Sequence, residues 1–201
     1  MEPGLLRDFY VSELKKGHDV ERQLVSALPT VIGMASLEEL RRVLESHLEQ
    51  TKDHATRLQM MLDAAGEETQ ADNNAQPDEQ KQAKCAGMGA LIAELQALQE
   101  QDLSPDVCDL ALIAYAQRIE HYEIAMYGTL RDYANALGDG DTASQLQSTL
   151  EEEQNADRQL TSIGQTITAR VASAEMPNEV KEKIQPSFAD EPRATKIKPA
   201  A

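Results

Sequence analysis

Residues 105–137, PDVCDLALIAYAQRIEHYEIAMYGTLRDYANAL, decide the fold class, because they predict one long helix with two acids on its apolar face. Pro105 suits the first turn of this helix and Gly138 suits its end. At about 100° per residue, the apolar stripe consists of Ile113, Ala116, Tyr127, Leu130 and Ala134. Glu120 and Glu123 lie within that stripe. The stretch predicts a bundle helix that turns carboxylates towards the core.

Three further stretches show the same period, which makes four long helices. They cover about residues 5–28, 37–65 and 142–171. Pro29 is expected to end the first of these helices. Ser36, with Glu39 three residues later, predicts a capping box at the start of the second. Aromatic residues make up only 3% of the chain, and abundant Ala, Leu, Glu and Gln favour an all-α fold.

The spacing of the four helices predicts how they connect. Two gaps of a few residues each make two antiparallel hairpins, whereas residues 66–104 form a long crossover with a short helical pattern over 88–98. This connectivity is typical of a ferritin-like four-helix bundle. We expect the bundle domain to cover residues 1–174. The proline-rich residues 175–201 have no helical period and predict a flexible C-terminal tail.

Charge and apolar content exclude several classes of partner. A net charge of −16 argues against binding nucleic acid and against docking on anionic lipid. No apolar run approaches the ~20 residues of a membrane span. The start of the chain lacks the basic and apolar segments of a signal peptide, and two cysteines make no disulfide framework. The expectation is a cytoplasmic protein without nucleic-acid or membrane partners.

Polar residues also interrupt the apolar stripes of the other helices. Glu21 falls in the middle of the stripe of the first helix. Glu153 and Asp157 are one turn apart in the stripe of the fourth helix. His47 and His54 lie on one shoulder of the second helix, where each could bond a neighbouring carboxylate instead of a metal. These residues join Glu120 and Glu123 as candidate metal ligands.

The register of the helices predicts that these side chains meet in one layer. Glu21, Glu120 and Glu153 each lie within about two turns of the middle of their own helix. Gln50 lies at the same level of the second helix. Buried, clustered carboxylates are costly unless cations neutralise them or they hold protons at a raised pKa. Because carboxylates with imidazoles suit iron or manganese, the sequence predicts either such a metal site or a layer of protonated acids.

Six short strings along the chain belong together: DVERQL at 19–24, HLEQT at 47–51, KCAGM at 84–88, EHYEIA at 120–125, YGTL at 127–130 and LEEE at 150–153. These strings resemble the YciE/YciF family. The match covers roughly residues 5–167, and the strings at 120–130 are its most specific part. The resemblance implies a ferritin-like, rubrerythrin-related bundle, a role in bacterial stress responses and a homodimer, with no assigned reaction.

Carried over position by position, the resemblance implies that the inward acids of the family are Glu21, Glu120, Glu123 and Glu153, with His47 also matching. Two positions depart from the expected pattern. The family often has Glu where this chain has Gln50, and Asp157 stands where a di-iron pattern offers His. Since an amide is a weak ligand, a single-metal site is the alternative to two ions, with His54 as a substitute ligand.

Two functions follow from these predictions. The first is a stress-protective protein that binds iron or manganese through inward carboxylates and reacts with oxygen or peroxide. The sequence does not assign it an enzymatic activity. The second is a metal-free helical homodimer with a vestigial acid layer, acting as a structural or interaction protein. Metal content separates the two, because bound metal must stabilise the folded state.

Overall fold

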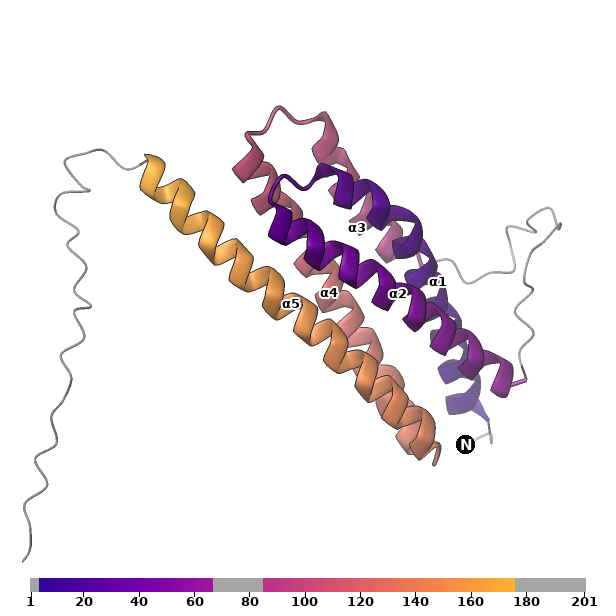
Figure 1. Cartoon of the computed structure of the whole chain (residues 1–201). Coiled ribbons are helices and arrows are strands. Elements are labelled where there is room, and N and C mark those ends of the chain that lie inside the picture. Colours follow the sequence, from indigo (N-terminus) through magenta and orange to yellow (C-terminus); the bar gives the residue numbers. More distant parts are fainter. Residues whose placement is uncertain (1–3, 67–84, 176–201) are drawn as a thin grey trace, which may run out of the picture.

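A computed structural model describes residues 4–66 and 85–175, which form an all-α bundle (Figure 1). Its elements are α1 (Leu5–Met34), α2 (Glu38–Ala64), α3 (Ala86–Gln96), a 3₁₀ turn η1 (Ala97–Glu100), α4 (Pro105–Ala136) and α5 (Gly140–Glu175). The four long helices and their order confirm the predicted fold class. Residues 67–84 of the predicted crossover and all but the first residue of the predicted tail lie outside the described residues.

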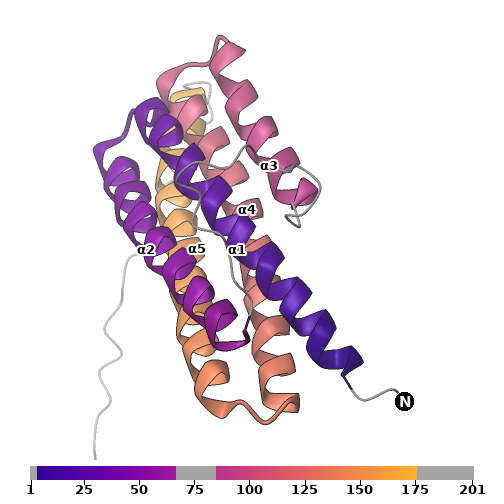
Figure 2. The same cartoon turned by 90° about the vertical axis from the view of Figure 1, so that its right-hand side faces the viewer.

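Two hairpins build the bundle, as the helix spacing predicted. The α1 helix packs along α2, and α4 packs along α5. The hairpins meet through contacts of α1 with α4 and of α2 with α5. The crossover places the short helix α3 outside this square, against α1 and α4 (Figure 2). None of the helices in the described part of the chain is long and apolar enough to cross a membrane.

Side chains of α1 fix the start of α3. The backbone N–H of Cys85 donates to Asp19 Oδ2 at 2.7 Å, and the Gln23 amide donates to the Cys85 carbonyl oxygen at 3.1 Å. These contacts join residues more than sixty positions apart, so they hold the crossover against the first hairpin.

The predicted end of the first helix is wrong, because α1 continues through Pro29 to Met34. A proline lacks one backbone N–H and therefore costs one helical hydrogen bond. Val31, one turn from Leu28, is 3% exposed and packs in the core, so burial of the last turn offsets that loss.

The predicted capping box at the start of α2 is also wrong. Leu37 is the residue before the helix, and no side chain near it in sequence caps the backbone. Instead, the N–H groups of Ser36 and Leu37 donate to the two carboxylate oxygens of Asp109 in α4, each at 2.8 Å. Asp109 is 1% exposed, so a buried tertiary contact binds the backbone N–H groups at the start of α2 in place of the expected local motif.

Glycine ends α2 and α4, as predicted. Gly66 and Gly138 have φ angles of 84° and 83°, in the left-handed region that a side chain disfavours. After α4, the N–H of Asp139 donates to the Ala134 carbonyl at 2.9 Å, which completes a Schellman motif. The α5 helix then runs to Glu175, one turn beyond the predicted end.

The apolar core is divided into two clusters along the bundle axis. One cluster contains α3 and includes Leu24, Leu44, Ile92, Ile119 and Leu160. The other lies towards the opposite end and includes Leu14, Leu58, Tyr127, Leu130 and Leu150. Because Glu21, Glu120 and Glu153 come between these sets in sequence on their own helices, a polar layer separates the clusters.

Candidate metal centre

Six buried titratable side chains from four helices form this polar layer. They are Glu21 of α1, His47 and His54 of α2, Glu120 and Glu123 of α4, and Glu153 of α5. Each of them is at most 4% exposed. The four glutamates point inward because each lies on the apolar face of its helix, as the periodicity predicted. The two histidines were predicted on a shoulder of α2, and both are nevertheless buried.

The six side chains make two groups of possible ligands that overlap at one residue. His47, Glu120, Glu123 and Glu153 form the first group, and Glu21, His54 and Glu153 form the second. Within each group, one ligand atom per residue lies within 4.8 Å of all the others. Glu153 belongs to both, so a single carboxylate lies between two candidate positions.

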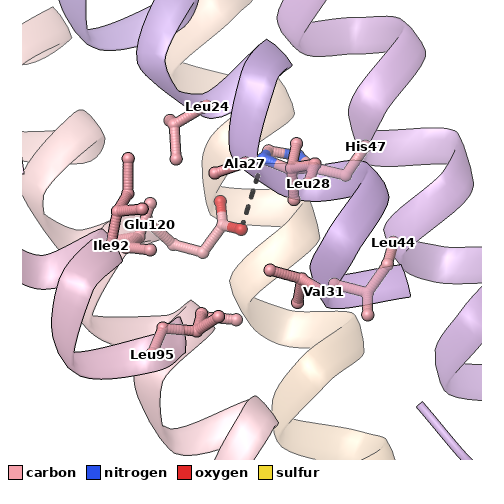
Figure 3. A pocket seen from close by; sticks show the side chains of 11 residues that line it. Leu24, Ala27, Leu28, Val31, Leu44, His47, Ile92, Leu95 and Glu120 are labelled. Atoms are coloured by element: carbon pink, nitrogen blue, oxygen red, sulfur yellow. Dashed lines mark ion pairs between the residues drawn. The ribbon is translucent and has the colours of Figure 1, made fainter. Parts of the chain in front are cut away.

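Close contacts between imidazoles and carboxylates define the inside of the layer. His47 Nε2 lies 3.5 Å from Glu120 Oε1, with the two side chains pointing towards each other (Figure 3). His47 Nδ1 lies 3.9 Å from Glu153 Oε2. His54 Nδ1 lies 2.9 Å from Glu153 Oε1 and 3.9 Å from Glu21 Oε1. The imidazole of each histidine therefore faces carboxylate oxygens of at least two other residues.

Several carboxylate oxygens in the layer lack a donor. Both oxygens of Glu123, and Oε2 of Glu21 and of Glu120, are buried and accept no hydrogen bond from any described residue. Buried polar atoms are nearly always paired, and leaving them unpaired is costly. These oxygens converge with unpaired imidazole nitrogen, which is the arrangement that a bound cation would satisfy.

The layer changes the proton affinity of its members. Burial, and then the negative charge of Glu153, raise the pKa of Glu21 to about 8. The same two causes raise the pKa of Glu120 and of Glu123 well above the usual value. Burial lowers the pKa of His47, which keeps that imidazole neutral.

His54 behaves in the opposite way from His47. Burial alone would lower the pKa of His54, but the carboxylates of Glu153, Glu21 and Glu152 outweigh it and raise the pKa to about 9. In the absence of metal, the layer therefore reaches neutrality with protons on several carboxyl groups and on His54.

Two further residues hold the ligands in place. The hydroxyl of Tyr127, which is 1% exposed, donates a hydrogen bond to Glu21. Glu152 Oε2 lies 2.7 Å from His54 Nε2 and accepts a hydrogen bond from Arg57 at 2.7 Å. With Nε2–H bound to Glu152, a His54 ring that loses its second proton would offer the lone pair of Nδ1 to a cation lying between it and the carboxylates of Glu153 and Glu21.

Sequence reasoning did not include Glu152 among the candidate residues and missed this contact. Glu152 is half-buried, and its partners His54 and Arg57 lie 98 and 95 positions earlier in the chain. On α5 alone it differs little from the exposed Glu151. Only the packing of α2 against α5 distinguishes the two acids.

The remaining predicted positions lie outside the two groups. Asp157 is half-buried, and its Oδ1 accepts a hydrogen bond from Gln117 at 3.0 Å and lies 3.6 Å from His121 Nε2. Gln50 is also only half-buried. Its neighbour Thr51 is fully buried, and the Thr51 hydroxyl donates to the His47 carbonyl oxygen at 2.9 Å. At the level of the polar layer, the inward positions of α2 are therefore His47, Thr51 and His54.

The donor set fits hard or borderline divalent metals. Four carboxylates and two imidazoles suit iron or manganese, whereas structural zinc sites rely on thiolates and imidazoles. Cys85 lies at the start of α3 and Cys108 lies in α4, and neither belongs to the two ligand groups. The residues present therefore fit a centre for one or two such ions.

Comparison with known proteins finds relatives along nearly the whole described chain. The model of a family described as "Domain of unknown function (DUF892)" matches residues 5–173. Protein YciF of Escherichia coli (strain K12) is 35% identical over 163 residues, which are 81% of this chain and 92% of that protein.

Solved structures give the same relation. The crystal structure of the E. coli stress protein YciF aligns with a TM-score of 0.71 at 32% identity, covering 84% of this chain and 99% of that chain. The structure of YcfI from Rhodopseudomonas palustris aligns with a TM-score of 0.68 at 31% identity, covering 80% of this chain and 96% of that chain. The bundle is thus one that these helical proteins share.

Proposed function

The chain belongs to the family described as "Domain of unknown function (DUF892)", and within it we propose that this protein binds two ions of iron or manganese and reacts with oxygen or peroxide. The observation that carries the proposal is the overlap of two ligand groups at Glu153. A carboxylate shared in this way supports a pair of ions, because its two oxygens can each face one position.

The residues of the layer would bind the two ions in two sets. His47, Glu120 and Glu123 would hold one ion, Glu21 and His54 would hold the other, and Glu153 would join them. Bound ferrous iron would supply the two electrons that, with two protons, convert hydrogen peroxide into two water molecules or dioxygen into hydrogen peroxide. Burial of the layer keeps bulk water away from this chemistry.

We also propose a stress-protective role in the cytoplasm, on the analogy of YciF, a relative described as a stress protein. A homodimer belongs to the same proposal. Leu5 and Phe9, one turn apart on α1, are 61% and 50% exposed, and exposed apolar side chains of this kind favour association. Sedimentation velocity should give the mass of two chains, and the mass of one chain would contradict the dimer.

Metal analysis of the full chain tests the proposed centre. We expect protein purified without chelator, or reconstituted with ferrous or manganous salt, to hold up to two ions per chain. Bound metal should also raise the thermal unfolding midpoint, since a ligand that binds only the folded state stabilises it. The measurements are elemental analysis after gel filtration and a thermal melt with and without metal.

The alternative of a metal-free structural dimer predicts the opposite result. Fewer than about 0.2 ions per chain, with no stabilisation by added iron or manganese, would rule out the metal centre, because tight binding to the folded state must raise its stability. The acid layer would then be a protonated polar layer that fixes the register of the helices.

A further inference from the structure

An apolar cavity lies directly beside one half of the polar layer. It has a volume of about 20 Å³ and is lined by residues of α1, α2, α3 and α4 that are each at most 9% exposed. Aliphatic side chains make most of its wall, among them Leu24, Ala27, Val31, Leu44, Ile92 and Leu95 (Figure 3). The crossover helix α3 contributes Ile92 and Leu95 to the outer part of this wall.

Only two polar side chains line this cavity, and both belong to the candidate centre. They are His47 and Glu120, from the first ligand group. His47 Nε2 and Glu120 Oε1 face each other at 3.5 Å, so one end of an otherwise aliphatic space opens onto possible metal ligands. The second group, with Glu21 and His54, does not contribute to the wall.

The scarcity of polar groups in the wall limits which molecules can bind in the cavity. A volume of about 10–15 Å³ suffices for one water-sized molecule, but a buried water needs two to four polar partners, and among the described residues only the end at His47 and Glu120 offers any. Hydrogen peroxide carries two hydroxyl groups, and the one at the aliphatic end would be buried without a partner, which is costly. A small apolar molecule has no polar group to leave unpaired, and its transfer from water into an apolar space lowers the free energy.

The opposite side of the layer has a different character. His54 contacts Glu152, which in turn pairs with Arg57. The side chains of Glu152 and Arg57 are each 32% exposed. This polar chain leads from the second ligand group towards solvent. The layer therefore has an aliphatic side at Glu120 and His47 and a polar side at His54.

We propose that the cavity is a binding site for molecular oxygen, held against the Glu120 and His47 side of the centre. The inference rests on the proposed function for the use of the oxygen, and it names dioxygen as the oxidant that this site takes. Binding itself depends only on the aliphatic wall, so it can be measured without metal.

Dissolved oxygen is paramagnetic and speeds the relaxation of methyl groups that it approaches, which gives a direct test. The full chain is freed of metal, because iron and manganese are themselves paramagnetic, and its methyl groups are labelled. Under oxygen pressure, the methyl groups of Leu24, Val31 and Ile92 should relax with a paramagnetic increase several-fold larger than those of Leu150 and Ile163, which are 5% and 4% exposed and do not line the cavity. Equal increases in the two sets would overturn the proposal.

A cavity-filling variant supplies the matched control. Ala27→Val adds two methyl groups to the wall, whereas Ala143→Val makes the same change at a buried alanine outside it. We expect the first variant to abolish the excess relaxation at Val31 and Ile92 and the second to keep it. If Ala27→Val does not fold, the comparison within the unmodified chain still decides the question.

A second measurement separates this proposal from the metal centre itself. Metal content of Ala27→Val should equal that of the unmodified chain, since Ala27 lies in neither ligand group. Its ferrous form should be oxidised by dioxygen several-fold more slowly, with the rate for hydrogen peroxide unchanged. Equal slowing with both oxidants would overturn the oxygen site, whereas absent metal binding in the unmodified chain would contradict only the proposed function.

Discussion

Glu153 is the residue on which the candidate centre depends most, because it belongs to both ligand groups. We expect Glu153→Gln to lose both ions, since an amide binds metal weakly and no other residue joins the groups. Glu21→Gln should lose only the ion of the second group, because the four ligands of the first group remain. Elemental analysis of the two variants measures the difference.

The control for this pair is Glu151→Gln, which removes an exposed carboxylate from the same helix. It should keep the full metal content. Equal metal content in Glu153→Gln and the unmodified chain would contradict the shared role of Glu153. Metal-free Glu153→Gln should be less stable than the unmodified chain, because the buried, protonated His54 loses the carboxylate that it faces.

Glu152 acts on the centre through His54 and does not face the two ligand groups. It binds His54 Nε2 and so leaves Nδ1 free to face Glu153. We expect Glu152→Gln to weaken metal binding by about 10- to 100-fold, as is typical when a carboxylate that orients a ligand histidine is lost. Competition with a chelator measures the affinity, and Glu151→Gln should leave it unchanged.

At the scale of the helices, Asp109 of α4 anchors the turn between α1 and α2. Asp109→Ala would leave the N–H groups of Ser36 and Leu37 without their acceptor. We expect the free energy of unfolding to fall by about 3 kcal/mol, the scale of two buried hydrogen bonds to a charged group. Urea unfolding of metal-free protein measures this change.

Asp106→Ala is the matched control, one turn earlier on the same helix. Asp106 pairs with Arg170 at the surface, where both side chains are at least 40% exposed. An exposed ion pair contributes at most about 1 kcal/mol. If both variants lost the same stability, the anchoring role of Asp109 would be wrong.

The helices also explain why the first predictions on α2 were incomplete. Helical period placed His47 and His54 on the shoulder of an apolar stripe, yet both are buried in the layer. The inward face of α2 is rotated enough to bury Thr51 and leave Gln50 half-buried. The rotation of a helix about its axis follows from its contacts with two neighbours, which periodicity within one helix does not define.

At the scale of the whole molecule, protons held by the layer predict how stability depends on pH. The pKa of Glu21 rises from 4.5 to about 8, and that of His54 rises from 6.5 to about 9. Between pH 7 and 9 the folded protein therefore binds more protons than the unfolded chain. Stability is present below these folded pKa values and is lost as pH rises through them.

We expect metal-free protein to have a lower free energy of unfolding at pH 9 than at pH 7, measured by urea titration with chelator present. Glu21→Gln should show a weaker dependence, because one of the two titrating groups is gone. Metal affinity should change in the other direction and increase with pH, since the ligands lose their protons when metal binds. A metal-free stability that increased from pH 7 to 9 would contradict the raised pKa of Glu21 and His54.

The number and order of the long helices, and the inward direction of Glu21, Glu120, Glu123 and Glu153, could be predicted from the sequence. These features depend on the 3.6-residue period and on spacing along the chain, which act locally. Glycine at the ends of α2 and α4 was predictable for the same reason.

Which residues complete the centre depends on how the helices pack against one another. The contacts of Glu152 with His54, and of Asp109 with the turn before α2, join residues 98 and more than 70 positions apart. Such contacts depend on how far each helix slides and rotates against its neighbours, and the packing of the whole core fixes that. The sequence therefore predicted a layer of carboxylates, and the packing of α1, α2, α4 and α5 arranged it as two ligand groups that share Glu153.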